Sequence, residues 1–380
     1  MRVRKICVIT GTRAEYGVIA PLLREIRRSK GLRLQLVVTG MHLLPEFGST
    51  IRLIKKDGFQ ISASFKMYDK KDADLEIPNS LCRATAGCAR AFKHLQPDIV
   101  LLEGDRLEML AAALASLAFR IPLVHVSGGD VSGGLDDSIR HTLTRLSHIH
   151  LANTLASCQR VKRMGEEPWR VSNVGTLAVT KAILREAASI GALKRIVPVD
   201  CTKPYFLVVQ HPVIEDAGLS ALHMRQTLVA ALSFDVPVVV MYPNCDTGSR
   251  ESIEEIDRFR KNPRMLVYRN LARSVYLGLL KHASVIIGNS SSGIVEAPFF
   301  GTPVVNVGSR QFGRERAGNT VDVSYSTRMI RTAIAGFRRN GFKRIFKNNP
   351  YRDMDTQKRI VRILRTIALD EKLLNKKLML

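Results

Sequence analysis

The 380-residue sequence lacks the signals of several specialised protein classes. No apolar run approaches the roughly 18–20 residues that a membrane-spanning helix needs. The six cysteines are scattered and form no C-x-x-C pair, which favours reduced thiols over a zinc site or a disulfide framework. The basic N-terminus leads into an apolar run of only four residues and then a glycine turn, which indicates a first strand rather than a signal peptide. We therefore expect a cytoplasmic protein.

Aromatic and acidic residues are also scarce. Aromatic residues make up 6% of the chain, and 34 Asp and Glu stand against 58 Lys and Arg, for a net charge of +24. Residues 328–380 alone hold 15 Lys and Arg against 4 Asp and Glu. Such a surplus is compatible with nucleic acid, anionic lipid or acidic metabolites, or with a solvated basic helix surface. Because few aromatic residues accompany the cations and no nucleic-acid-binding signature is present, we expect no specific nucleic-acid partner.

What the sequence does contain is a regular alternation of two patterns. Short apolar segments that indicate buried strands alternate with longer segments that have helical spacing of apolar residues. In the first half the expected strands are 5–10, 34–39, 99–102, 123–126 and 150–152, and the expected helices are 18–29, 47–57, 80–93 and 107–119. In the second half the strands are 205–209, 236–241, 265–267, 285–287 and 304–307, and the helices are 218–233, 252–261, 274–282 and 293–299.

Near-continuous apolar strands that alternate with helices indicate parallel sheets covered on both faces. The chain is also too long for one compact core. We predict the α/β class with two Rossmann-like doubly wound domains, residues 1–176 and 177–355. The C-terminal segment 356–380, with a basic helix over 356–374, is expected to cross back and complete the first domain. Two such sheets in tandem place a ligand cleft between them, at the carboxyl ends of the strands.

Two motifs follow strands of the first half. GTRAEYG, residues 11–17, places a flexible glycine and Arg13 at the start of a helix, an arrangement suited to phosphate or to an ordinary strand–helix turn. EGDRLE, residues 103–108, places Asp105 where catalytic carboxylates are found in such sheets, with Arg106 beside it to hold a diphosphate. Asp105 is also a good candidate for a helix N-cap.

A third motif, HVSGGDVSGGLDDSIRH at 125–141, is the richest in ionisable groups. It combines four glycines with acids, an arginine and two histidines, the groups needed to move protons around an anionic substrate; a charged structural turn is the alternative. Asp137 and the serine after it are expected to cap a helix in which Asp136 pairs with Arg140 four residues later.

The second half carries polar loops after its strands. His211 follows one strand directly and is either a site group or a satisfied core histidine. The loop YPNCDTGS, residues 242–249, supplies Asn244 for sugar or ribose contacts. His148 and His150 stand two residues apart, but no third ligand with zinc spacing follows, so we expect no metal site.

The stretch GNSSSGIVEAP, residues 288–298, is the strongest signal of the second half. Ser290 and Ser291 stand at an expected helix start suited to an anion, and Glu296 is one turn inside, where it can accept hydrogen bonds from ribose hydroxyls. GSRQFGRER, residues 308–316, adds Arg310 nearby. Glycine- and serine-rich turns also occur for structural reasons alone.

These motifs occur together, in one order, over about residues 6–316, and in that combination the chain resembles the hydrolysing UDP-N-acetylglucosamine 2-epimerases: GTRAEYG, GDRLE, SGGDVSGGLDDSIRH, QHPV, GNSSSGIVEAP and GSRQFGRE. The resemblance implies a GT-B arrangement of two Rossmann-like domains with no cofactor. It implies elimination of UDP from UDP-N-acetylglucosamine to a glycal, followed by addition of water to give UDP and N-acetylmannosamine, a precursor of sialic-acid-like sugars. We expect a UDP-sugar as the partner and a homodimer or homotetramer.

The resemblance also assigns roles to individual residues. It implies that Asp105 and Asp136 act as acid and base with Arg140 nearby, and that His211 lies near the leaving diphosphate. The positions that match UDP contacts of the family are Arg13, Ser290, Ser291, Glu296 and Arg310.

One position departs from the family pattern. Some members carry a glutamate two residues after the histidine of this strand end, as His-x-Glu-Gly-Gly, whereas this chain has Ser127. Other members have histidine there and glutamate where this chain has Asp130, so Asp130 becomes the candidate for the missing acid. Three alternatives stay open: a UDP-diacetamido-trideoxyhexose as substrate, a GT-B glycosyltransferase, and an inactive nucleotide-sugar-binding protein.

Overall fold

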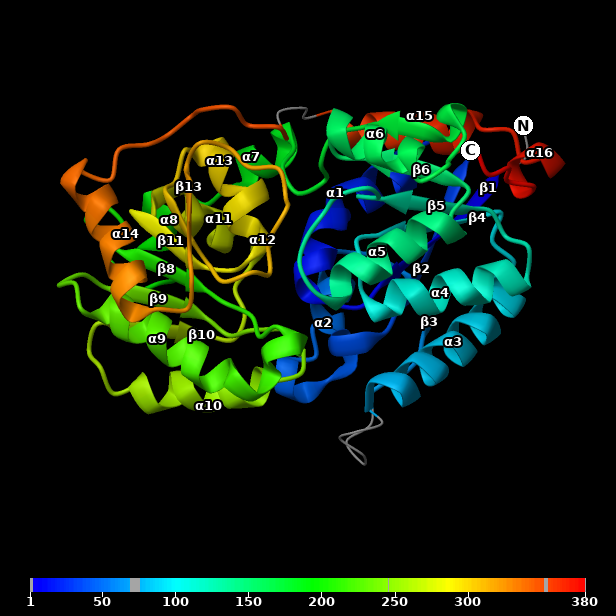
Figure 1. Cartoon of the computed structure of the whole chain (residues 1–380). Coiled ribbons are helices and arrows are strands. Elements are labelled where there is room, and N and C mark those ends of the chain that lie inside the picture. Colours follow the sequence, from blue (N-terminus) through cyan, green and yellow to red (C-terminus); the bar gives the residue numbers. More distant parts are fainter. Residues whose placement is uncertain (1–2, 69–75, 245, 352–354, 380) are drawn as a thin grey trace. The chain divides into compact units, whose positions relative to one another are not determined.

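The computed structural model describes residues 3–68, 76–244, 246–351 and 355–379, which form two units with one parallel sheet each (Figure 1). The first unit contains Met1–Asp130, Asp136–Thr180 and Asp353–Leu380, and the second contains Val131–Leu135 and Lys181–Arg352. Among the helices of the described ranges, none combines the length and the apolar character required to cross a membrane.

The sheet of the first unit has seven parallel strands in the order β3-β2-β1-β4-β5-β6-β7. The chain starts in the middle of the sheet, builds outward to β3, and then continues on the other side of β1. Its strands are β1 (Arg4–Thr10), β2 (Leu32–Val38), β3 (Ile61–Ser64), β4 (Ile99–Glu103), β5 (Leu123–Val126), β6 (Ile149–Ala152) and β7 (Val171–Asn173). Its helices are α1 (Arg13–Arg28), α2 (Ile51–Lys56), α3 (Glu76–Leu95), α4 (Leu107–Ala118), α5 (Leu135–Leu146), α6 (Leu155–Arg163), α15 (Thr356–Thr366) and α16 (Glu371–Leu374).

The second unit repeats this topology with six parallel strands in the order β10-β9-β8-β11-β12-β13. Its strands are β8 (Phe206–Val209), β9 (Val238–Met241), β10 (Met265–Tyr268), β11 (Val285–Gly288), β12 (Val304–Val307) and β13 (Thr320–Val323). Its helices are α7 (Lys181–Glu186), α8 (Ile190–Leu193), α9 (Ser220–Leu232), α10 (Ser249–Phe259), α11 (Arg273–His282), α12 (Ser291–Val295), α13 (Ala297–Phe300) and α14 (Thr327–Arg339).

Burial on both faces of each strand explains why the sequence shows continuous apolar runs. In β8, Leu207 and Val209 pack in one core with residues of α11, whereas Phe206 and Val208 pack in another core with residues of α9 and α14. Successive side chains of a strand point to opposite faces, so both faces of this sheet are covered by helices. The predicted α/β class with two Rossmann-like sheets is confirmed.

Strand order also locates the ligand edge of each unit. In both sheets the order reverses at one point, between β1 and β4 in the first unit and between β8 and β11 in the second. Loops that leave the carboxyl ends of such a strand pair run to opposite sides of the sheet and leave a crevice where ligands bind. The motifs at residues 11–17 and 103–108 flank the first of these points, and His211 and residues 288–298 flank the second.

Two predicted helices are each divided into two shorter helices in the structure. The segment 356–374 is not one helix, because Asp370 caps a separate helix, α16, by accepting a hydrogen bond from the Leu373 backbone N–H at 2.9 Å. The segment 293–299 is divided between α12 and α13, which meet at Glu296. Strands β3, β7 and β13 were not anticipated, because their side chains are largely half-buried or exposed and leave no apolar run to recognise.

Candidate active site

Arg140 of α5 joins two of the sequence motifs at the ligand edge of the first unit. Its side chain is 1% exposed and forms ion pairs with Asp105, beyond the end of β4, and with Asp137 at 2.9 Å. Its Nη1 also donates to the backbone oxygen of Asp130 at 3.2 Å. Burial lowers the pKa of Arg140, but the negative charges of Asp105, Asp130 and Asp137 outweigh this effect. The pKa of Arg140 is therefore raised above its usual value. A fixed cation therefore holds these acids together.

Helix α5 begins earlier than the sequence suggested. It starts at Leu135, so Asp136 and Asp137 lie in its first turn, where the helix dipole stabilises negative charge. The prediction that Asp137 and the serine after it cap the helix is therefore wrong. Asp137 pairs instead with Arg140, one turn further along, and lies 3.4 Å from His141 Nε2.

The two polar residues after β4 have different surroundings. The N-cap of α4 is Arg106, which makes no side-chain capping bond, so the alternative that Asp105 is the N-cap is wrong. Asp105 is partly exposed and directed to Arg140. Arg106 Nε lies 3.5 Å from Glu108 Oε2, and the Glu108 side chain is fully buried.

A row of hydrogen bonds crosses the ends of β4, β5 and β6. Ser127 Oγ lies 3.2 Å from Glu103 Oε1 and 3.4 Å from Asn153 Oδ1. Asn153 Nδ2 donates to Asp130 Oδ2 at 2.8 Å, and the Ser157 hydroxyl donates to Asp130 Oδ1 at 2.7 Å. Asp130 is 4% exposed, whereas Glu103 is half-buried. The sequence contained Glu103 within a recognised motif, but its partnership with Ser127 depends on the pairing of two strands.

The turn after β1 places Arg13 at the first position of α1. Thr12 caps this helix by accepting from the Glu15 backbone N–H at 3.2 Å, and Glu15 Oε2 accepts from the Gly11 backbone N–H at 2.9 Å. Burial and the negative charge of Glu103 raise the pKa of Glu15 well above its usual range. Burial also lowers the pKa of Arg13, although an arginine stays charged near neutral pH.

Three histidines of the first unit have structural partners. His125 Nε2 lies 2.8 Å from the Gly104 carbonyl, and burial lowers the pKa of His125 to about 4, so the imidazole is neutral. His148 Nδ1 accepts from the Leu123 backbone N–H at 3.0 Å, and His150 Nε2 lies 2.9 Å from Glu166. Across the described ranges, no group of three or more His, Cys, Asp and Glu residues is arranged to hold a metal ion.

In the second unit, His211 is fixed at the point where the strand order reverses. Its backbone N–H donates to Asn289 Oδ1 at 2.7 Å, and Asn289 Nδ2 donates back to the His211 carbonyl at 2.8 Å, which ties the ends of β8 and β11 together. His211 Nδ1 accepts from the Asn244 backbone N–H at 3.1 Å, so in the neutral ring the proton is on Nε2. Position 245, in the same loop as Asn244, lies outside the described residues.

Gly288 allows the chain to turn at the end of β11. Its φ is +128°, and a β-carbon there would lie 2.2 Å from the Val209 carbonyl oxygen, so only glycine fits. Ser290 then caps α12 by accepting from a backbone N–H at 3.3 Å, and Ser291 is exposed at the first position of that helix. Arg310 Nη1 donates to the Asn289 carbonyl at 3.4 Å, at the residue that directly precedes Ser290.

Glu296 is buried, 3% exposed, and forms an ion pair with Arg273 at the start of α11. The middle of the loop between β5 and α5, Val131–Leu135, is grouped with this unit, where the Gly133 backbone N–H donates to the Arg310 carbonyl at 2.9 Å. A β-carbon on Gly133 would lie 2.6 Å from the Ser309 carbonyl, so this close approach requires glycine.

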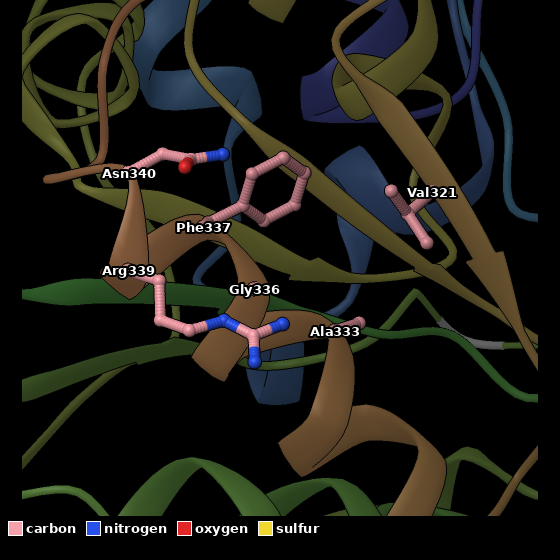
Figure 2. Close-up of a pocket in the computed structure, with 6 residues that line it drawn as sticks. All are labelled: Val321, Ala333, Gly336, Phe337, Arg339 and Asn340. Atoms are coloured by element: carbon pink, nitrogen blue, oxygen red, sulfur yellow. The ribbon is translucent and has the colours of Figure 1, made fainter.

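A separate surface depression of about 330 Å³ lies on α14 and β13. Figure 2 shows the residues that line it, which are Val321, Ala333, Gly336, Phe337, Arg339 and Asn340. None of the candidate residues from the sequence is among them, and Arg339 is its one charged side chain. The candidate residues lie instead at the carboxyl edge of the sheet within each unit.

Comparison with known proteins places the chain in a family. A family model described as UDP-N-acetylglucosamine 2-epimerase matches residues 24–365. The chain is 35% identical over 375 residues to a Legionella pneumophila protein named UDP-N,N'-diacetylbacillosamine 2-epimerase (hydrolyzing), covering 98% of this chain and 99% of that protein. It is 35% identical over 327 residues to a Campylobacter jejuni protein named GDP/UDP-N,N'-diacetylbacillosamine 2-epimerase (hydrolyzing), covering 85% of each.

Two further comparisons agree. A Neisseria meningitidis protein named UDP-N-acetylglucosamine 2-epimerase is 32% identical over 332 residues, covering 87% of this chain and 86% of that protein. The fold matches a crystal structure of a UDP-GlcNAc 2-epimerase from Neisseria meningitidis bound to UDP-GlcNAc, with a TM-score of 0.81 at 18% identity, covering 95% of this chain and 99% of that one. The resemblance found in the motifs is confirmed, and the chain belongs to the UDP-N-acetylglucosamine 2-epimerase family.

Proposed function

We propose that this protein is a hydrolysing 2-epimerase that acts on a UDP-activated 2-acetamido sugar, and that UDP-N,N'-diacetylbacillosamine is a better substrate than UDP-N-acetylglucosamine. The observation that carries the proposal is the near full-length similarity to the Legionella pneumophila enzyme named for that diacetamido sugar. The Neisseria meningitidis relative named for UDP-N-acetylglucosamine is less similar, over less of the chain. The sequence had favoured UDP-N-acetylglucosamine, with the diacetamido sugar as an alternative.

The reaction has two steps. In the first, a base removes the proton from carbon 2, the bond from carbon 1 to the diphosphate oxygen breaks, and UDP leaves with the bonding electrons as a carbon–carbon double bond forms. In the second, the oxygen of water bonds to carbon 1 and an acid returns a proton to carbon 2 on the other face. We assign the two base steps, removal of the proton from carbon 2 and acceptance of a proton from the attacking water, to Asp105 and Asp136, with Arg140 as the cation that orients Asp105. The ion pair between Arg140 and Asp105 supports this assignment.

Charged and hydrogen-bonding side chains are assigned to the diphosphate of the nucleotide. His211 and Arg310 in the second unit, and Arg13 and Arg106 in the first, have the charge or hydrogen-bond donors that suit a departing diphosphate. The support from geometry is that His211 and Arg310 both contact Asn289 at the reversal point of the sheet.

Other polar groups of the second unit suit the nucleoside. Ser290 and Ser291 offer hydroxyls at the start of α12, and Asn244 offers an amide beside His211. Glu296 is the acceptor for ribose hydroxyls, with Arg273 holding its carboxylate in position.

The test is to incubate the purified protein in deuterated water with each UDP-sugar separately. The proposal expects release of UDP together with a free sugar that is inverted and deuterated at carbon 2, with at least tenfold higher kcat/KM for UDP-N,N'-diacetylbacillosamine. Equal or higher kcat/KM for UDP-N-acetylglucosamine would overturn the substrate assignment. Release of UDP only after an acceptor sugar is added would indicate a glycosyltransferase, and bound but unchanged substrate would indicate a binding protein.

Substitutions test the assigned proton carriers. Asp105→Asn and Asp136→Asn keep the size of each side chain but remove its acid–base function, and such groups contribute about 10²–10⁴-fold to rate. We expect each variant to lose at least about a hundredfold in kcat while retaining UDP affinity by calorimetry. Asp235→Asn is the control, because Asp235 is 99% exposed in a surface ion pair. Full activity in either site variant removes that aspartate from the mechanism.

A further inference from the structure

Glu103 places a carboxyl group beside the one position at which this chain departs from its family. Strands β4 and β5 are parallel neighbours with Glu103 opposite Val126, so Ser127 is the next residue along the adjacent strand. Ser127 Oγ lies 3.2 Å from Glu103 Oε1. In members with glutamate at the position of Ser127, the carboxyl comes from the end of β5. Here β4 supplies one next to the same position.

We propose that Glu103 takes over the role of the missing glutamate and delivers the proton to carbon 2 in the hydration step. This assignment rests on the proposed hydrolysing 2-epimerase function. It requires that Glu103 carry a proton, that substrate can reach it, and that no nearer acid is available.

The hydrogen bonds around Ser127 favour a proton on Glu103. Asn153 donates through Nδ2 to Asp130, so Asn153 Oδ1 faces Ser127 and can only accept. A serine hydroxyl has a single proton, and Ser127 contacts two acceptors if Glu103 is ionised. A protonated Glu103 removes the conflict, because it donates to Ser127 Oγ while Ser127 donates to Asn153.

Burial separates Glu103 from Asp130, the candidate that the sequence offered. Both carboxylate oxygens of Asp130 accept hydrogen bonds, from Asn153 and Ser157, and its side chain is 4% exposed. Such a carboxylate is engaged through both oxygens and lies away from solvent. Glu103 is only half-buried, so a ligand at the strand ends can reach it. We therefore assign Asp130 to holding Asn153, and through it Ser127, in place.

Atoms and electrons balance in this hydration step. The protonated carboxyl of Glu103 gives its proton to carbon 2 of the glycal, and the electron pair of the double bond forms the new carbon–hydrogen bond. The water oxygen bonds to carbon 1, and the proton released from water passes to a carboxylate of the site. Glu103 is left ionised and regains its proton from solvent before the next turnover.

The experiment uses UDP-N,N'-diacetylbacillosamine with the full-length protein in single-turnover assays that measure UDP, glycal and free sugar separately. Glu103→Gln preserves the shape and removes the transferable proton. We expect UDP release within a few-fold of wild type, accumulation of the glycal, and formation of free sugar at least about a hundredfold slower, the lower range for loss of a general acid. The double variant Glu103→Gln/Ser127→Glu restores the carboxyl from β5, and we expect at least tenfold recovery.

Three results would each overturn the role of Glu103. They are formation of free sugar at the wild-type rate in Glu103→Gln, equal loss of UDP release and hydration in that variant, and no recovery in the double variant. Glu254→Gln, at an exposed glutamate of α10, is the matched control, and equal melting temperatures exclude a folding defect. A wild-type protein that leaves every UDP-sugar unchanged would overturn the proposed function itself, and this assignment with it.

Discussion

Removing the charge of Lys376 should destabilise the first unit, because this residue of the basic C-terminal segment holds the end of α5. Lys376 Nζ donates to the carbonyl of Arg145, in the last turn of α5, at 2.8 Å, and to the carbonyl of Ser147, just after the helix, at 2.7 Å. It also lies 2.8 Å from the Glu166 carboxylate. Its side chain is 15% exposed. A cation at a helix C-terminus satisfies carbonyls that have no partner within the helix and interacts favourably with the helix dipole.

The magnitude follows from these contacts. Lys376→Met keeps a long side chain but removes three charge-assisted hydrogen bonds, each worth about 1.5–3 kcal/mol when a charged group takes part. Water can reach some of the released carbonyls, and Arg145 and His150 still contact Glu166, so the loss is smaller than the sum. We expect about 3 kcal/mol. At about 2–4 °C per kcal/mol for a unit of this size, the melting temperature should fall by about 6–12 °C.

The assay is fluorescence-detected unfolding in urea and by heat. Trp169 is the single tryptophan of the chain and lies in the first unit, with Lys372 Nζ 5.1 Å from its ring, so it reports on this region. Lys377→Met is the matched control, because Lys377 is exposed, and surface substitutions of this kind change stability by less than about 0.5 kcal/mol. If the free energy of unfolding of Lys376→Met lies within about 0.5 kcal/mol of the control, the C-terminal segment does not stabilise α5 through this lysine.

Three further perturbations test other parts of the molecule. Gly288→Ala should lower the free energy of unfolding by about 3 kcal/mol or more, because the new β-carbon meets the Val209 carbonyl at 2.2 Å at a φ of +128°; a loss below about 1 kcal/mol in urea would contradict this packing. Burial lowers the pKa of His125 and of His148 to about 4, below the value of about 6.5 expected when unfolded. Their contribution to stability is therefore complete above about pH 6.5 and is lost as pH falls towards 4, by up to roughly 3 kcal/mol each, and urea midpoints that do not change between about pH 7 and 5 would refute it. Arg140→Lys should lower kcat at least tenfold without changing UDP affinity in calorimetry, because an ammonium group cannot reproduce the guanidinium contacts to several acids; unchanged kcat would refute the orienting role.

Local sequence patterns predicted the fold class because strands buried on both faces must be apolar at every position. They failed where burial is partial: most side chains of β3, β7 and β13 are half-buried or exposed and leave no such pattern. They also failed at helix boundaries, since the start of α5 at Leu135 depends on how its first turn packs. Within α5 the structure pairs Arg140 with Asp137 at 2.9 Å, whereas the sequence had suggested Asp136.

By itself, then, the sequence determined the two α/β units, the motifs at their strand ends, and the family. It could do so because the residues that form a site at the carboxyl edge of a parallel sheet come directly after the strands in the sequence. Tertiary structure alone decided which of the acids lie together. Glu103 and Ser127 are 24 residues apart and meet only through the register between β4 and β5. Contacts between neighbouring parallel strands join residues that no local sequence pattern connects. Glu103, the proton donor that we propose, is brought to Ser127 in this way.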